Sequence, residues 1–237
     1  MCVSRAPVFL LLCGLVQSTV VWAARPFVTD DARLTTAGSC QVESWTRFYT
    51  ESREIWALPA CNPTGNLEFT VGGGSATPKD QSATTDQVYQ LKTLFRPLNT
   101  NGWGIGLALG RVLHPDVNPG PNLLGNSYAY VPLSVSFHDD KVIMHSNLGW
   151  LKDNASGQDR TTWGLGAEVI AGARLLLIAE TFGDDKNKPY WQTGVRYSVI
   201  PNLLQVDATV GQQVGGDVAA RWLSFGLRWI PEKLFGK

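Results

Sequence analysis

Large apolar residues alternate with small or polar residues in many short segments of this chain. In segment 220–230, the odd-numbered positions from Leu223 to Trp229 are large and apolar, whereas Ser224 and Arg228 lie between them. A period of two residues is typical of a β-strand whose two faces meet different environments. Soluble sandwiches and membrane barrels both contain such strands, so this segment alone does not distinguish them.

The same alternation recurs along the chain, in segments separated by turn-forming residues. The predicted strands are 39–49, 53–61, 66–74, 86–96, 102–113, 126–137, 141–151, 160–170, 173–182, 189–200, 203–212 and 219–230. Their length matches the roughly 9–11 residues that a tilted strand needs to cross a bilayer, and an even number is usual in bacterial barrels. We therefore predict an all-β fold, an antiparallel up-and-down transmembrane β-barrel of about twelve strands.

In the interiors of the predicted strands, charged residues share one face, and the other face is apolar. The polar face carries Glu43, Arg47, Glu68, Lys92, His145, Glu168, Arg174, Glu180, Arg196, Asp207 and Arg228. A charge that faces lipid near the midplane costs about 2–4 kcal/mol, whereas a charge that faces a wet lumen costs little. These residues are therefore predicted to line the lumen. A soluble secreted β-domain with its charges outside is the alternative fold.

Three further features favour the barrel. Aromatic residues gather near strand ends, as in interfacial girdles: Phe48, Trp103, Phe137, Trp150, Trp163, Trp191 and Trp229. Inward positions are often small, as at Gly164 and Gly166. Longer polar connections are predicted on the outer side, at 75–85, 114–125, 152–159, 183–188 and 213–217, and short turns on the periplasmic side.

The chain is predicted to have three parts, a signal peptide, a short lead-in segment and the barrel. Residues 1–24 resemble a secretory signal peptide, with Arg5, a short apolar core and small residues at its end. An uncleaved membrane helix is the alternative, although the core is short for one. Residues 25–38 form a periplasmic lead-in or partial plug, and residues 39–237 form the barrel.

Removal of the signal peptide leaves two cysteines, Cys40 and Cys61. Two cysteines in an oxidising compartment predict one disulfide, with two free thiols as the alternative. A tight hairpin centred between residues 50 and 51 places Cys40 opposite Cys61 and Arg47 opposite Glu54, within reach of a disulfide and an ion pair. The same register turns Trp56 and Leu58 inward, which the sequence does not explain.

The mature start resembles a known family. The residues Arg25-Pro26-Phe27-Val28-Thr29-Asp30-Asp31-Ala32, followed by Gly38 and Gln41-Val42-Glu43, are similar to the opening of the phenol-degradation (MetA-pathway) outer-membrane family, whose members are often described as transporters. The aromatic-rich closing strand is similar as well, but the chain continues beyond it to Lys237. The resemblance implies an outer-membrane barrel that passes aromatic or other hydrophobic small molecules.

The sequence contains few patterns that are typical of catalytic or cofactor-binding sites. His145, Ser146 and Asn147 are consecutive on a strand, so they cannot converge on one substrate. The pairs Asp139-Asp140 and Asp184-Asp185 fit turns better than a cation site. The run of glycines at 72–74 has neither the lysine nor the helix of a phosphate loop. We expect no catalytic residues, no cofactor and no metal, so an outer-membrane enzyme is the least favoured reading.

The sequence therefore predicts a passive channel or transporter for small molecules in the bacterial outer membrane. A non-conducting structural or surface-interaction barrel with a filled lumen is the alternative. Opposite charges mix evenly on the inward face, so strong ion selectivity is not expected. The expected partners are outer-membrane lipid, the barrel-assembly machinery and small solutes; a formal net charge of zero gives no indication of nucleic-acid binding.

Overall fold

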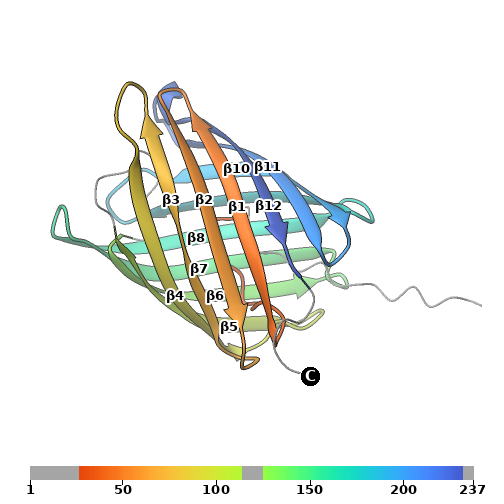
Figure 1. Cartoon of the computed structure of the whole chain (residues 1–237). Coiled ribbons are helices and arrows are strands. Elements are labelled where there is room, and N and C mark those ends of the chain that lie inside the picture. The colour runs from red at the N-terminus through yellow and green to blue at the C-terminus, as the bar shows by residue number, and fades with distance from the viewer. Residues whose placement is uncertain (1–26, 114–124, 232–237) are drawn as a thin grey trace, which may run out of the picture.

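Twelve antiparallel strands form a closed barrel in the computed structural model, which describes residues 27–113 and 125–231 (Figure 1). The strands are β1 (Ser39–Tyr49), β2 (Ser52–Asn62), β3 (Glu68–Pro78), β4 (Thr84–Arg96), β5 (Trp103–Leu113), β6 (Ser127–Phe137), β7 (Val142–Asp153), β8 (Gln158–Ile170), β9 (Leu175–Asp184), β10 (Tyr190–Ile200), β11 (Leu204–Gln213) and β12 (Trp222–Trp229). A short 3-10 helix, η1 (Val218–Ala220), precedes β12. Each strand pairs with its neighbours in sequence, and β1 pairs with β12.

The predicted fold class is therefore confirmed, and the number of strands is the predicted number. The predicted signal peptide and most of the predicted outer loop at 114–125 lie outside the described residues. Within the described ranges, no helix is long and apolar enough to cross a membrane.

Several strand ends differ from the prediction. Strand β3 continues beyond the glycine run to Pro78, so the loop predicted at 75–85 shrinks to 79–83. The β7–β8 hairpin also extends, to Asp153 and Gln158. Glycines 72–74 pair with β4 and, at 73 and 74, with β2, so cross-strand hydrogen bonding outweighs the weak strand preference of glycine. The difference in length between the outer loops and the turns is consequently smaller than predicted.

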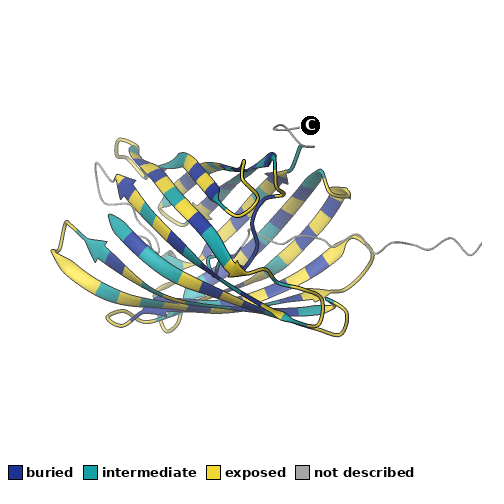
Figure 2. Cartoon of the chain, turned by 90° about the horizontal axis from the view of Figure 1, so that it is seen from below, coloured by how far each residue is buried: buried dark blue, intermediate teal, exposed yellow. Residues whose placement is uncertain are grey.

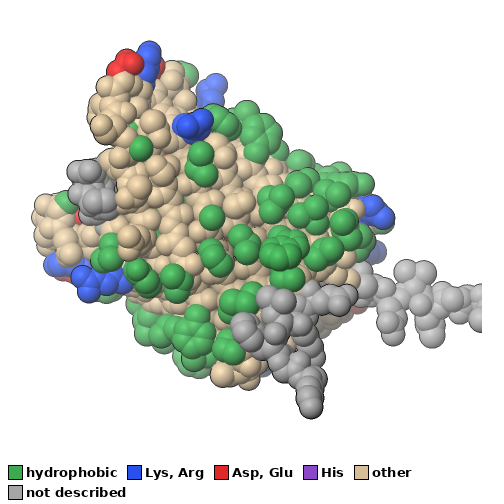
Figure 3. All heavy atoms as spheres, in the orientation of Figure 1, with side chains coloured by type: hydrophobic (Ala, Val, Ile, Leu, Met, Phe, Trp, Pro, Cys, Tyr) green, Lys and Arg blue, Asp and Glu red, His purple; other side chains and the backbone are tan. Residues whose placement is uncertain are grey.

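The two faces of the wall have opposite character. Apolar side chains point outward and are exposed, for example Phe95 at 68% and Leu148 at 64%. Charged side chains point inward and are buried, for example Arg196 at 1% and Glu168 at 2%. In Figure 3, hydrophobic side chains spread over the wall, while several Lys, Arg, Asp and Glu side chains lie near its ends. A soluble domain has the opposite arrangement, so this surface suits a hydrocarbon environment.

The predicted aromatic girdle residues are all on the outward face. Phe48, Trp103, Phe137, Trp150, Trp163, Trp191 and Trp229 are each more than a third exposed. Six of them lie at or near the ends of their strands, where amphipathic rings suit the interface between hydrocarbon and headgroups. Trp163 differs from the prediction, because it lies near the middle of β8 and pairs with Leu148 on β7.

A charge placed on the outward face tests this orientation. Replacing Leu148, in the middle of β7, with arginine is expected to lower the free energy of unfolding in lipid by about 2–4 kcal/mol. Leu148→Ala is the matched control, because it removes the side chain without adding a charge. Unfolding in phospholipid vesicles measures both. Equal stability of the two variants would show that this face does not meet hydrocarbon.

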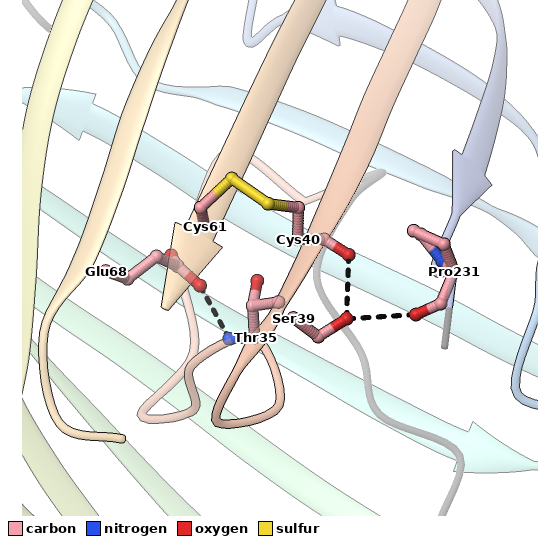
Figure 4. Close-up of a disulfide and its surroundings, with 6 residues drawn as sticks. All are labelled: Thr35, Ser39, Cys40, Cys61, Glu68 and Pro231. Carbon is pink, nitrogen blue, oxygen red and sulfur yellow. Dashed lines mark hydrogen bonds between the residues drawn. A yellow bond between two sulfur atoms is a disulfide. The ribbon is translucent and has the colours of Figure 1, made fainter. Parts of the chain in front are cut away.

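The first hairpin has the predicted register. Cys40 pairs with Cys61 and forms a disulfide (Figure 4). Arg47 pairs with Glu54, with 3.6 Å between Nη1 and Oε2. The disulfide lies at the end of the hairpin away from the turn, next to Ser39, the first residue of β1. The bond therefore fixes β1 to β2 where the chain enters the barrel.

Trp56 and Leu58 do point inward, and the structure explains why. They pack against a buried apolar cluster formed by Val88, Val112, Tyr128 and Leu151. The indole of Trp56 lies flat over Gly74, where an added Cβ would come within 2.2 Å of the ring. Trp45 stacks beside it, with ring centroids 5.7 Å apart. One side of the lumen is therefore apolar, and the charged residues occupy the remainder.

Candidate functional site

Residues 27–38 lie inside the barrel, and we call this segment the strap. Most of its side chains are buried: Phe27, Thr29, Asp31, Ala32, Arg33, Leu34 and Thr35. Figure 2 shows this buried stretch of chain, which belongs to no strand, within the ring of strands. It contacts the wall from β9 to β2 and then continues into β1. The strap therefore occupies part of the lumen.

Two wall residues bind consecutive main-chain groups of the strap. The carboxylate of Glu180, on β9, accepts hydrogen bonds from the amides of Val28 and Thr29, both at 2.8 Å. The side-chain amide of Asn147, on β7, accepts from the nitrogen of Asp30 at 2.7 Å and donates to its carbonyl at 2.8 Å. Asn147 thereby pairs with the strap as a neighbouring strand would.

Three more wall residues continue this pattern along the strap. The amide of Ala32 donates to the hydroxyl of Ser134 on β6 at 2.8 Å. The amide of Thr35 donates to the carboxylate of Glu68 on β3 at 2.5 Å (Figure 4). Asn62, the last residue of β2, donates from Nδ2 to the carbonyl of Thr35 at 2.7 Å. The wall therefore satisfies main-chain groups over most of the strap.

Ion pairs hold the middle of the strap. The ammonium of Lys92, on β4, lies 2.7 Å from a carboxylate oxygen of Asp30 and 3.6 Å from one of Asp31. The guanidinium of Arg33 lies 3.6 Å from the carboxylate of Glu168 on β8. Lys92, Asp31, Arg33 and Glu168 are all buried. Removal of one member would leave a buried charge uncompensated, which is strongly destabilising.

Two glycines of β8 make room for the strap. A Cβ on Gly164 would lie 2.5 Å from the hydroxyl of Thr29, and one on Gly166 would lie 2.7 Å from the ring of Phe27. The Phe27 ring also packs against Leu176 on β9. The small inward residues predicted from the sequence are therefore the positions where the wall accepts strap side chains.

His145 connects the wall to the strap through Ser134. The Ser134 hydroxyl accepts from the amide of Ala32 and shares a hydrogen bond of 2.8 Å with Nδ1 of His145. Nε2 of the same ring lies 3.7 Å from a carboxylate oxygen of Glu168. His145 and Asn147 share the inward face, as predicted. Both have structural contacts that account for their positions.

The other predicted lumen residues are mostly paired inside the wall. Arg228 lies 3.4 Å from Glu43 and donates two hydrogen bonds to Gln41. Arg196 is buried near Glu168, and Asp207 is buried on β11.

Arg174 is the exception to the lumen prediction. It is exposed in the turn before β9 and donates to the carbonyl of Val199 at 3.4 Å. Because β9 begins at Leu175, the inward parity does not extend to this residue.

The paired carboxylates act as turn residues. Asp139 accepts a hydrogen bond from Asn101 in the neighbouring turn, at 2.6 Å, and Asp184 accepts from the main-chain amides of residues 186 and 187. Among the described residues, no group of three or more His, Cys, Asp or Glu side chains is arranged to hold a metal ion.

The sequence predicts the charged partners of the strap as lumen residues, but it does not predict that they bind one segment. Asn62 and Ser134 are not among the predicted lumen residues, because isolated polar residues at inward positions are common in a barrel lumen. A signal was nevertheless present: polar inward residues occur on β2, β3, β6, β7 and β9, facing a segment that contains Asp30, Asp31 and Arg33.

The model of the family described as uncharacterised conserved protein UCP029691 matches residues 11–229. This match does not carry the phenol-degradation description, so that assignment is not confirmed. No curated protein sequence matches the chain.

Solved structures of porin-like outer-membrane channels have the same fold. The NanC porin is 9% identical with a TM-score of 0.58, and the KdgM porin is 9% identical with a TM-score of 0.57; each match covers 80% of this chain and 98% of the other. The COG4313 outer membrane channel from Pseudomonas putida F1 is 11% identical with a TM-score of 0.54, covering 85% of this chain and 98% of the other. At these identities the likeness establishes the fold alone.

Proposed function

We propose that this chain, which belongs to the family described as uncharacterised conserved protein UCP029691, is a channel for small solutes in the bacterial outer membrane. The barrel-assembly machinery inserts it, and passage requires the strap to leave its seat. The fold shared with porin-like channels supports this proposal.

One observation carries the proposal: side chains, not a strand ladder, attach the strap to the wall. Glu180, Asn147, Ser134 and Glu68 bind its main chain, and ion pairs with Lys92 and Glu168 bind its side chains. These contacts can break while all twelve strands of the barrel stay paired. Water can replace each of them once the strap moves, because the seat is polar.

The apolar side of the lumen fits aromatic solutes among those that pass. Trp56, Leu58 and Tyr130 point inward and are only partly buried. The rings of Trp56 and Tyr130 offer stacking surfaces, and the charged residues elsewhere on the inward face keep the rest of the lumen wet.

Larger side chains on β8 that displace the strap test the proposal. In the double variant Gly164→Val/Gly166→Val, the new side chains would occupy the positions of Thr29 and Phe27. Valine suits a strand, so β8 is expected to remain intact. We expect discrete conductance steps in planar bilayers from this variant, and few or none from the unaltered protein.

Ala167→Val is the matched control, because residue 167 directly follows Gly166 in sequence and lies on the opposite, outward face of β8. It should conduct as the unaltered protein does. A folded Gly164→Val/Gly166→Val barrel with an accessible strap and no conductance would contradict the channel proposal.

That result would instead support a structural barrel with a filled lumen. The observation that favours this second candidate is the tight burial of Arg196, Glu168 and His145 within the wall. These side chains point into the lumen, and two of them also contact the strap, Glu168 through Arg33 and His145 through Phe27.

A further inference from the structure

We propose that the strap seat is a binding site for short peptides, with the strap occupying it when no peptide is present. This inference rests on the proposed function, because the strap must leave before another chain can enter. The ligand class is argued from the parts of the strap that the wall contacts.

The wall recognises main-chain groups that every peptide has. Five strap amides, those of residues 28, 29, 30, 32 and 35, donate to wall side chains. Two strap carbonyls, those of residues 30 and 35, accept from wall amides. Main-chain hydrogen bonds of this kind give affinity with little dependence on sequence, as in the addition of a strand to a sheet edge.

Most of the wall groups that bind the main chain of the strap are hydrogen-bond acceptors. Two carboxylates, Glu68 and Glu180, accept strap amides, so the site demands N–H donors. Both carboxylates are buried, so water would have to supply donors to them if the site stood empty. Successive peptide amides supply such donors, as those of Val28 and Thr29 do to Glu180.

Side-chain contacts add a preference without excluding other sequences. Lys92 favours acidic residues at the positions of Asp30 and Asp31, and Glu168 favours a basic residue at the position of Arg33. The glycines of β8 leave room for side chains at the positions of residues 27 and 29. A peptide of about nine residues with an acidic centre followed by a basic residue fits these contacts best, by the side-chain complementarity of strand-like recognition.

The test weakens the attachment of the strap and leaves the wall unaltered. The full-chain variant Val28→Pro/Asp30→Pro/Ala32→Pro removes three strap amides that donate to wall side chains, because proline has no N–H, and it leaves every wall residue in place. Three labelled peptides are then titrated against it in detergent: residues 27–36, a scrambled peptide of the same composition, and residues 27–36 with N-methyl groups at positions 28, 29 and 30. Fluorescence anisotropy measures binding, and bilayer recordings measure block of conductance.

We expect the native-order and scrambled peptides to bind within about tenfold of each other, and the N-methylated peptide to lose more than about a hundredfold, because charge-assisted hydrogen bonds are lost. A neutral oligosaccharide should not compete. Binding of the native-order peptide alone would overturn the inference, since the seat would then fit only its own strap. Equal binding by the N-methylated peptide, or stronger binding by the oligosaccharide, would also overturn it.

The two readouts separate this inference from the proposed function. Anisotropy reports on the seat whether or not the barrel conducts. Peptide binding without conductance in the variant would contradict the channel and support the peptide site. Conductance without peptide binding would support the channel and contradict the site.

Discussion

Replacing Lys92 with methionine is expected to release the strap from the lumen. Lys92 is almost completely buried and pairs with both Asp30 and Asp31, and Asp31 also pairs with Arg33 at 3.4 Å. Its loss leaves two carboxylates without this partner inside the wall, and breaking a buried ion pair in this way costs about 3–5 kcal/mol. The strap can avoid that cost by leaving, whereas the strand ladders of the barrel are unaffected.

Limited proteolysis measures the release. Arg33 is buried against Glu168 in the docked strap, so trypsin should not cleave after it in the unaltered protein. In Lys92→Met, cleavage after Arg33 should yield a barrel fragment that begins at Leu34. Adding Asp30→Asn and Asp31→Asn to this variant should restore resistance, because no uncompensated carboxylates remain. A Lys92→Met protein as resistant as its parent would show that these ion pairs do not hold the strap.

Loss of the disulfide is the second large effect that we expect. The bond joins Cys40 and Cys61, which are 21 residues apart in sequence. Closing a loop of this length in the unfolded chain is worth about 3 kcal/mol in the chain-entropy description. The variant Cys40→Ser/Cys61→Ser should therefore unfold at lower urea concentration, in phospholipid vesicles, by an amount equivalent to that free energy.

Reduction supplies the control for this measurement. Dithiothreitol should lower the stability of the unaltered protein to that of Cys40→Ser/Cys61→Ser and should not change the variant itself. Unchanged stability after both treatments would mean that the ladder between β1 and β2 alone fixes the first hairpin.

The fold could be predicted because it depends on local patterns. Alternation with a period of two assigns each residue to a face, and the short turn at 50–51 sets the register that opposes Cys40 to Cys61. The position of Trp56 also follows from this register, although its environment does not. The cluster that surrounds it comes from β4, β5, β6 and β7, which are distant in sequence.

The strap seat could not be predicted in the same way. Its residues come from seven strands, and no local pattern states which inward polar residues lie at one height in the barrel. For residues 25–38, the sequence therefore allows two interpretations, a lead-in or a partial plug. Arg174 shows a related limit, because parity is meaningful only within a strand and β9 begins one residue later.

The arrangement of the seat has a consequence for the order of assembly. The strap is synthesised before every strand of the barrel, yet its partners extend from Asn62 on β2 to Glu180 on β9. A chain inserted only as far as β4 offers Asn62, Glu68 and Lys92 but lacks the residues that bind the main-chain groups of Val28 to Ala32. Complete docking therefore requires most of the barrel to have formed. An accessible strap would accordingly distinguish a barrel whose insertion is incomplete from one that has closed.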